Sequence, residues 1–293
     1  MLPRKVGIIG FGKVGQYLAD AVLRNPRSQN LLELAFVCDS FAPNTLANSS
    51  VVPDELKTYN IDTIEEFKAD LIVEVAHPSI TKLHGPRLLK SADYYVASTT
   101  AFADINTEFA MMQEADRSSG KAIYASVGAL FGAHDIQKMD ASGKLDQLSI
   151  KMTKHPDSFM PVVGTKEYEL NESAKFSKKP IELFRGSVRD IAKVFPVNVN
   201  TMATAALAGS RTVGFDQTEA VIVADSTLET MIIEVDMRGP PTDNGNPGLV
   251  VQSRRENPSV RGEVTGPATM ISFYASLLNV AKSGGGQDGI HLV

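Results

Sequence analysis

The stretch Val6-Gly7-Ile8-Ile9-Gly10-Phe11-Gly12-Lys13-Val14-Gly15 decides the fold of the first part of this chain. A short apolar run enters a glycine-rich turn, and the residues after the turn have the apolar spacing of a helix. Gly10 would permit the tight turn, Gly12 would let the backbone approach phosphates, and Gly15 would let helix and strand pack closely. Such a unit holds a dinucleotide pyrophosphate at the helix N-terminus. We therefore predict cofactor contacts at Gly10, Gly12, Lys13, Val14 and Gly15.

The next apolar run strengthens this interpretation, because a glycine pattern alone is a weak signal. Residues 32–38 have the composition of a buried strand and end at Asp39, near the spacing of roughly 20 residues at which a ribose-binding acid is expected. A carboxylate there can accept both ribose hydroxyls and would repel a 2′-phosphate, so Asp39 favours NAD over NADP. The alternative is that Asp39 caps a helix or shapes a turn.

Strand and helix patterns alternate through the first part of the chain. We expect further strands at 69–76, 94–98 and 122–125, separated by helices at 79–91 and 106–119. This order predicts an α/β fold with a Rossmann-type, doubly wound parallel sheet. The ligand crevice of such a sheet lies beyond the carboxyl ends of its strands.

The pattern changes from about residue 128 onward. Residues 148–153 alternate with period two, as a strand with one solvated face does. We expect further strands at 220–224, 231–237 and 249–253, and helices at 188–194, 201–208 and 268–281. This mixture predicts an α+β domain that covers a nucleotide crevice, followed by a last helix and a short tail.

Composition narrows the range of partners and compartments. The chain has 293 residues and a net charge of −5, without a basic block, so we expect neither nucleic acid nor an anionic membrane as a partner. One cysteine excludes an internal disulfide and suits a reducing compartment. No run approaches the roughly 20 apolar residues of a membrane span. The first strand leaves no room for a secretion signal, so we expect a cytoplasmic protein. Scattered histidines predict no metal site.

Small and polar residues at the ends of the predicted strands are candidates for cofactor contacts. Ala76 and His77 follow the third strand and Ser98 follows the fourth, so they should border the nicotinamide half of the crevice. For His77 two interpretations stay open, a histidine that faces the ligand and a histidine that is merely packed.

The candidates in the second domain are two basic residues and two asparagines. His155 follows the first strand of that domain and could move a proton near neutral pH, although an exposed loop histidine is the alternative. Its neighbour Lys154 could bind a substrate carboxylate or be a solvated charge. Asn198 and Asn200 precede a helix of small residues, which they can cap or from which they can present amide groups to a ligand.

Taken together, these segments resemble the L-aspartate dehydrogenase family, and most closely its animal branch, the aspartate dehydrogenase domain-containing proteins. The resemblance spans essentially the whole chain. Besides the glycine motif, it rests on Glu74-Val75-Ala76-His77-Pro78, Gly128-Ala129, Thr153-Lys154-His155-Pro156-Asp157, Phe195-Pro196-Val197-Asn198-Val199-Asn200, Val223-Ala224-Asp225, Arg255-Glu256-Asn257-Pro258 and Gly289-Ile290-His291-Leu292.

The resemblance implies both an architecture and an activity. A Rossmann domain of residues 1–127 plus 264–293 would carry an inserted substrate and dimerisation domain of residues 128–263. The implied enzyme is a homodimer that uses NAD or NADP to oxidise L-aspartate to iminosuccinate, which water hydrolyses to oxaloacetate and ammonia. The family's alanine and asparagine contacts to the cofactor carry over to Ala129 and to Asn198 or Asn200.

The family's catalytic histidine has no counterpart in this sequence. It is expected shortly after Ala224-Asp225, where either Ile232 or Ile233 stands instead or the residue is deleted. Loss of a general acid or base typically lowers a rate about 10²- to 10⁴-fold. Three hypotheses therefore stand: a dehydrogenase in which His155, His77 or a water moves the proton, a catalytically silent dinucleotide-binding homologue that acts as a sensor or binds a partner, and a reductase of another acid.

Overall fold

The chain forms two compact units. The computed structural model describes residues 2–117, 120–246, 248–283 and 289–293. By their contacts, residues 1–128 and 270–293 make up one unit, and residues 129–269 make up the other. No helix in the described ranges is long and apolar enough to cross a membrane.

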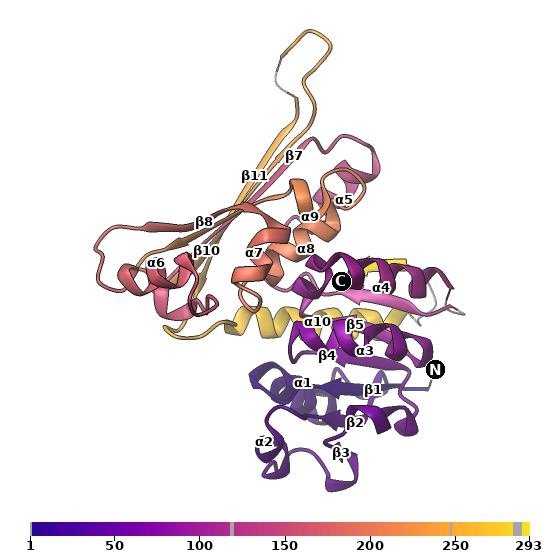
Figure 1. Ribbon diagram of the computed structural model, residues 1–293. Helices are drawn as coiled ribbons and strands as arrows, with labels where there is room; N and C mark the ends of the chain where they lie inside the picture. Colours follow the sequence, from indigo (N-terminus) through magenta and orange to yellow (C-terminus); the bar gives the residue numbers. More distant parts are fainter. Residues whose placement is uncertain (1, 118–119, 247, 284–288) are drawn as a thin grey trace. The chain divides into compact units, whose positions relative to one another are not determined.

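The first unit is built on a parallel sheet (Figure 1). Within the described residues, seven strands lie in the order β12-β6-β5-β4-β1-β2-β3, and each neighbouring pair is parallel. The strands are β1 (Arg4–Ile9), β2 (Leu32–Cys38), β3 (Lys57–Thr58), β4 (Leu71–Glu74), β5 (Asp93–Val96), β6 (Ala122–Ala125) and β12 (Gly289–Leu292). The helices are α1 (Lys13–Arg24), α2 (Pro43–Ala47), α3 (Pro78–Ser91), α4 (Ile105–Arg117) and α10 (Pro267–Ser283), with 3-10 segments η1 (Asp54–Leu56), η2 (Ile61–Phe67) and η3 (Thr99–Ala103). The predicted doubly wound α/β fold is confirmed.

The central strands of this sheet are buried along their whole length. Every residue of β4 and β5 is buried, because helices cover both faces of a doubly wound sheet. Helix α10 shares this core: Leu277 is fully buried, and the hydroxyls of Tyr274 and Ser28 lie 2.8 Å apart. The C-terminal helix thus completes the core that the N-terminal strands begin.

The chain ends in a strand, where the sequence predicts a short tail. Strand β12 pairs in parallel with β6, and the N–H of Val127 donates to the carbonyl of Val293 at 2.8 Å. Four residues have no strand stability of their own. They form a strand here because the neighbouring strand β6 supplies hydrogen-bond partners along one side.

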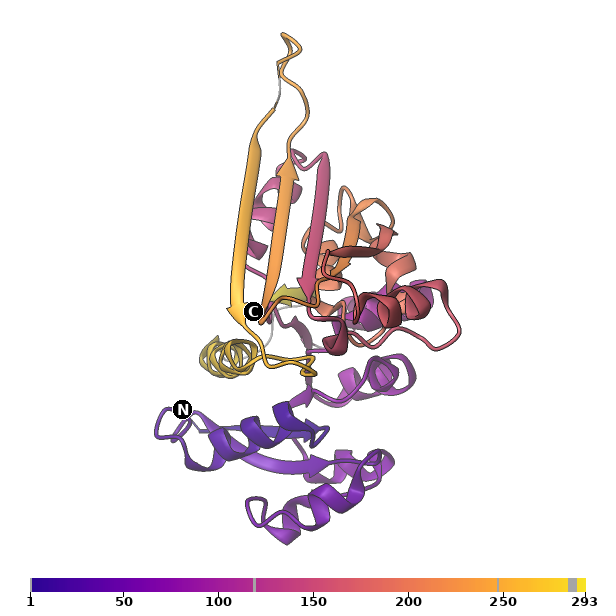
Figure 2. The same cartoon turned by 90° about the vertical axis from the view of Figure 1, so that its left-hand side faces the viewer.

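The second unit is a mixed sheet with helices (Figures 1 and 2). Its described strands lie in the order β11-β10-β7-β9-β8, with β7 and β9 parallel and the other pairs antiparallel. They are β7 (Gln147–Lys154), β8 (Ile181–Ser187), β9 (Glu219–Ala224), β10 (Thr230–Arg238) and β11 (Val250–Pro258). The helices are α5 (Ala133–Ala141), α6 (Lys166–Ala174), α7 (Val188–Val194), α8 (Asn200–Ala208) and α9 (Gly214–Gln217), with the 3-10 segment η4 (Pro156–Ser158).

The long strands of the second unit have one covered face and one open face. In β10 the buried residues alternate with half-exposed ones. A Cβ on Gly132, at the start of α5, would lie 3.7 Å from Met237, and one on Gly209, at the end of α8, would lie 3.6 Å from Leu148. Helices α5 and α8 therefore cover the part of the inner face to which Met237 and Leu148 belong. The opposite face of β7, β10 and β11 is called the outer face below.

Candidate cofactor and substrate sites

The glycine turn has the shape that a pyrophosphate needs. Gly10 has φ +104°, and a Cβ on it would lie 2.8 Å from Ala76. A Cβ on Gly15 would lie 1.9 Å from the carbonyl oxygen of Gly10, so α1 approaches the turn as closely as glycine permits. Gly12, the N-cap of α1, borders open space, because a Cβ there would meet nothing within 4 Å. These residues fit a dinucleotide phosphate at the helix N-terminus.

Asp39 connects the glycine turn to the loop after β2. Its Oδ2 accepts the N–H of Phe11 at 2.7 Å, and its Oδ1 accepts the N–H groups of Phe41 at 2.9 Å and Ala42 at 2.8 Å. The side chain is buried. Asp39 thus shapes the turn, which is the alternative role considered for it. Each oxygen retains acceptor capacity, and the predicted ribose contact stays a prediction.

Glu74 connects two predicted cofactor contacts, Ala76 and Ser98, and sequence reasoning missed it. It ends β4 and is fully buried. Its Oε1 accepts the N–H of Ala76 at 2.8 Å and the hydroxyl of Ser98 at 3.0 Å, and its Oε2 accepts the N–H of Ser98 at 3.1 Å. Burial raises the pKa of Glu74 to about 7, although these hydrogen bonds lower it. The available signal was an acidic residue in an otherwise apolar strand.

His77 caps helix α3. Its Nδ1 accepts the N–H of Ser79 at 3.2 Å, and the centres of its ring and the Phe41 ring lie 6.3 Å apart. Burial lowers the pKa of His77, and repulsion from Lys82 lowers it further, so the imidazole is neutral at pH 7. A neutral ring can accept a proton. The catalytic role of His77 stays a prediction.

Ala129, a predicted cofactor contact, accepts a hydrogen bond from an arginine of the inner face. Arg255 Nη1 donates to the Ala129 carbonyl at 2.8 Å, and its Nε donates to Asn257 Oδ1 at 2.6 Å. The guanidinium carbon lies 4.1 Å from the ring centre of Phe131. Burial lowers the pKa of Arg255, which nevertheless stays charged. Asn257 Nδ2 is buried and has no hydrogen-bond partner in the structure as described.

Lys154 is buried at the end of β7, contrary to the solvated-charge alternative. Lys154 is only 2 % exposed, and its Nζ donates one hydrogen bond, to the carbonyl of Val264 at 2.9 Å. Burial lowers the pKa of Lys154 to about 8. The ammonium is therefore mostly charged at pH 7, although little of the residue is in contact with solvent.

His155 is buried rather than exposed in a loop. It caps η4, where its Nδ1 accepts the N–H of Asp157 at 3.2 Å. Burial lowers the pKa of His155 and repulsion from Arg261 lowers it further, while the Asp157 carboxylate and a hydrogen bond to the backbone of Ser226 act in the opposite direction. Because its pKa lies below the usual value, the ring is neutral at pH 7. Its catalytic role stays a prediction.

The two asparagines have different surroundings. Asn198 is buried, and its amide bridges the segment after η4: Oδ1 accepts the N–H of Met160 at 2.8 Å, and Nδ2 donates to the carbonyl of Ser158 at 3.0 Å. Asn200 is the first residue of α8 and is half-buried. Neither asparagine provides the side-chain cap of α8, whose N-cap residue is Val199. Their cofactor contacts stay predictions.

The two positions proposed for the missing histidine lie on opposite faces of β10. Ile233 is buried and lies directly opposite Met152 of β7 on one side and Arg255 of β11 on the other, so it belongs to the inner face. Ile232 is half-exposed and belongs to the outer face. Of the two positions, only Ile233 shares a face with Lys154 and Arg255.

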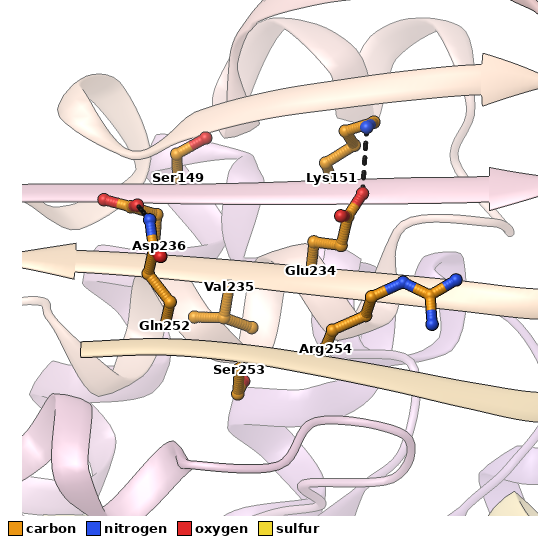
Figure 3. A pocket seen from close by; sticks show the side chains of 8 residues that line it. All are labelled: Ser149, Lys151, Glu234, Val235, Asp236, Gln252, Ser253 and Arg254. Atoms are coloured by element: carbon orange, nitrogen blue, oxygen red, sulfur yellow. Dashed lines mark hydrogen bonds and ion pairs between the residues drawn. The ribbon is translucent and has the colours of Figure 1, made fainter.

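The outer face of β7, β10 and β11 carries a hollow of ≈ 390 Å³ whose charged residues are paired (Figure 3). Lys151 Nζ lies 2.9 Å from Glu234 Oε2, and Gln252 donates to Asp236. Arg254, at the rim, lies 2.8 Å from Glu256. Within this hollow the charges of the chain already balance one another.

Comparison with known proteins identifies the family. Residues 10–125 match the NAD binding domain of homoserine dehydrogenase, and residues 135–280 match the C-terminal domain of aspartate dehydrogenase. An aspartate dehydrogenase domain-containing protein of Danio rerio is 39 % identical over 97 % of this chain and 96 % of its own length. The chain belongs to the aspartate dehydrogenase family. The resemblance found in the sequence, including the animal branch, is confirmed.

More distant members of the aspartate dehydrogenase family show how far the likeness extends. An L-aspartate dehydrogenase of Methanosarcina acetivorans is 29 % identical over 80 % of this chain and 83 % of its own length. The crystal structure of aspartate dehydrogenase from Thermotoga maritima aligns with this chain over 94 % of this chain and 96 % of the Thermotoga chain, with a TM-score of 0.67 at 21 % identity. This likeness shows a shared fold. The matched NAD binding domain supports a nicotinamide dinucleotide as the cofactor.

Proposed function

We propose that this chain is an oxidoreductase that uses NAD to oxidise L-aspartate to iminosuccinate, which water hydrolyses to oxaloacetate and ammonia. The observation that carries the proposal is the glycine turn, whose open position at Gly12 leaves room for phosphates, in a chain whose residues 135–280 match aspartate dehydrogenase. The relatives named L-aspartate dehydrogenase support the same substrate.

The residues of the first unit would hold the cofactor. The glycine turn, with Lys13 and Val14, would bind the pyrophosphate, and Asp39 would accept the ribose hydroxyls. Glu74 would keep Ala76 and Ser98 in place beside the nicotinamide ring. When bound, the nicotinamide supplies the hydride acceptor. The family resemblance implies further cofactor contacts at Ala129 and at either Asn198 or Asn200.

The loop after β2 supports NAD rather than NADP. After Asp39 there is no lysine or arginine until Lys57, and Lys57 Nζ already lies 2.7 Å from Asp54 Oδ1. A 2′-phosphate would therefore meet the Asp39 carboxylate without a cation to offset it. We expect NADH to bind at least 10-fold more tightly than NADPH.

The proton step is assigned to a histidine. Oxidation of an amine to an imine releases a proton from nitrogen, and a neutral imidazole can accept it. Both His155 and His77 have lowered pKa values and are neutral at pH 7. Replacing the acting residue by asparagine should lower kcat about 10²-fold or more, whereas replacing the other should not.

A spectrophotometric assay tests the function. Purified protein with NAD and L-aspartate should produce reduced cofactor, with D-aspartate as the inactive control. No reduced cofactor between pH 6 and pH 10 would remove the proposal. NADH binding without turnover would instead favour the catalytically silent homologue, which the absent family histidine supports.

We also propose a homodimer in the cytoplasm, with neither nucleic acid nor membrane as partner. The support for these statements is the family resemblance, the single buried Cys38 and the net charge of −5. Light scattering coupled to gel filtration should give twice the mass of one chain.

A further inference from the structure

The inner face of the second unit carries two cations, Lys154 and Arg255. Lys154 lies two residues beyond Met152, so both residues share one face of β7. On the neighbouring strand β10, Ile233 lies directly opposite Met152 of β7. On its other side, Ile233 lies directly opposite Arg255 of β11. Lys154 and Arg255 therefore point to the same side of the sheet, two strands apart.

Their separation suits one small ligand. Strands lie about 4.8 Å apart, so the backbones of β7 and β11 are about 10 Å apart across the intervening β10. Lysine and arginine side chains are long enough to approach each other over such a span. Asn257 lies on β11 two residues beyond Arg255 and shares its face.

Neither cation has a carboxylate beside it in the part of the chain that the structure describes. Lys154 has one hydrogen bond, to a carbonyl, although an ammonium has three donors. The hydrogen bonds of Arg255 go to the carbonyl of Ala129 and to the amide oxygen of Asn257. Burying a charge without an opposite charge is costly. The buried Nδ2 of Asn257 is a further unused donor.

The outer face of the same strands shows the usual solution. Lys151, three residues before Lys154 on β7, pairs with Glu234. Arg254, directly before Arg255 on β11, pairs with Glu256. The chain thus balances these two cations of the outer face and leaves two unbalanced on the inner face, where Lys154 is buried and Arg255 is half-buried.

We propose that Lys154 and Arg255, assisted by Asn257 Nδ2, bind the two carboxylates of a dicarboxylic amino acid and so determine the substrate specificity of the chain. One carboxylate would lie at the ammonium of Lys154, and the other at the guanidinium of Arg255. The ligand then supplies the two negative charges that the inner face lacks. For its reaction the proposal rests on the aspartate oxidation proposed above, but the binding can be tested without turnover.

The proposal predicts a defined ligand preference. Succinate keeps both carboxylates and lacks the amine, so it should bind with NAD present and not turn over. Propionate has one carboxylate and should bind at least 100-fold more weakly. As a substrate, L-asparagine should have a kcat/KM at least 100-fold below that of L-aspartate, because an amide cannot replace the second charge.

Four single variants test the residues by calorimetric titration with succinate and, separately, by the KM for L-aspartate. Lys154→Met and Arg255→Met should each weaken succinate binding and raise KM about 100-fold. The matched controls from the outer face, Lys151→Met and Arg254→Met, should change both by less than about 3-fold. Circular dichroism confirms that each variant is folded, and Arg255→Lys should recover part of the binding if Arg255→Met misfolds.

The outcomes separate this proposal from the proposed function. In one outcome, the protein binds succinate through Lys154 and Arg255 and yet does not oxidise aspartate. That result would support the proposed binding site and contradict the proposed enzymatic function. If Lys154→Met and Arg255→Met both oxidise aspartate with an unchanged KM, the proposed binding site is wrong and the proposed enzymatic function stands. A wild-type chain that binds neither succinate nor L-aspartate also overturns the binding site.

Discussion

Glu74 in the first unit and Lys154 in the second are both buried titratable side chains with no opposite charge beside them among the described residues, yet the chain surrounds them differently. Glu74 accepts hydrogen bonds from two loops of its own unit. Lys154 makes one bond to a carbonyl. A buried ion whose partners belong to the chain organises those partners, whereas a buried ion whose partners are missing is available to a ligand. Glu74 is thus a positioning residue, and Lys154 is a candidate binding residue.

The largest difference should appear in stability when Glu74 is truncated. Glu74→Ala leaves two N–H groups and one hydroxyl buried without their acceptor, at about 1–3 kcal/mol each, so the free energy of unfolding at pH 5 should fall by about 4 kcal/mol. Urea denaturation measures it. Glu234→Ala, which removes a half-exposed carboxylate from the outer face, is the control and should cost less than about 1 kcal/mol. Equal losses in the two variants would contradict the positioning role.

The next effect is a pH dependence that belongs to Glu74. Its pKa is raised from 4.5 to about 7 in the folded state, so between these values the folded chain holds a proton that the unfolded chain has released. Stability from this group is therefore fully present below pH 4.5 and is lost as the pH rises to about 7, by on the order of 3 kcal/mol.

The difference between wild type and Glu74→Gln isolates this effect from other titrating groups. Chemical denaturation at intervals from pH 4.5 to 8 should show a fall for the wild type that the variant lacks. Parallel curves for the two proteins would show that Glu74 does not titrate in this window.

The smallest effect should be that of Lys154→Met on the stability of the free protein. The substitution removes one hydrogen bond and one uncompensated buried charge, and these changes oppose each other. We expect the free energy of unfolding at pH 7 to change by less than about 1 kcal/mol, measured by urea denaturation. A fall of 3 kcal/mol or more in the free energy of unfolding would show that Lys154 stabilises the fold. In that case Lys154 and Glu74 would not differ in the way argued above.

Much of the first unit could be predicted because its signals are local. A glycine that must adopt φ +104° and an apolar run before it are properties of a few neighbouring residues, so the turn at Gly10 is visible in the sequence. Strand β12 is different. Its four residues become a strand only beside β6, which lies far away in the sequence.

The candidate sites divide in the same way. The sequence places His155 at the end of a strand, but its burial and its role as the cap of η4 depend on the segments packed around it. Asp39 could be expected at the turn. Its three backbone hydrogen bonds depend on how the loop after β2 folds back. Residue type is local, whereas accessibility and partners are not.

The sequence by itself determined the dinucleotide turn, the alternation that makes a doubly wound sheet, and the family, because these depend on residue order and spacing. Only the tertiary structure decided that Glu74 connects Ala76 and Ser98, and that Lys154 and Arg255 lie on the inner face of the second unit while Lys151 and Arg254 lie on its outer face. The physical reason is that the energy of a charge is set by its solvent access and by the groups around it. Those groups come from strands that pair across long stretches of the chain.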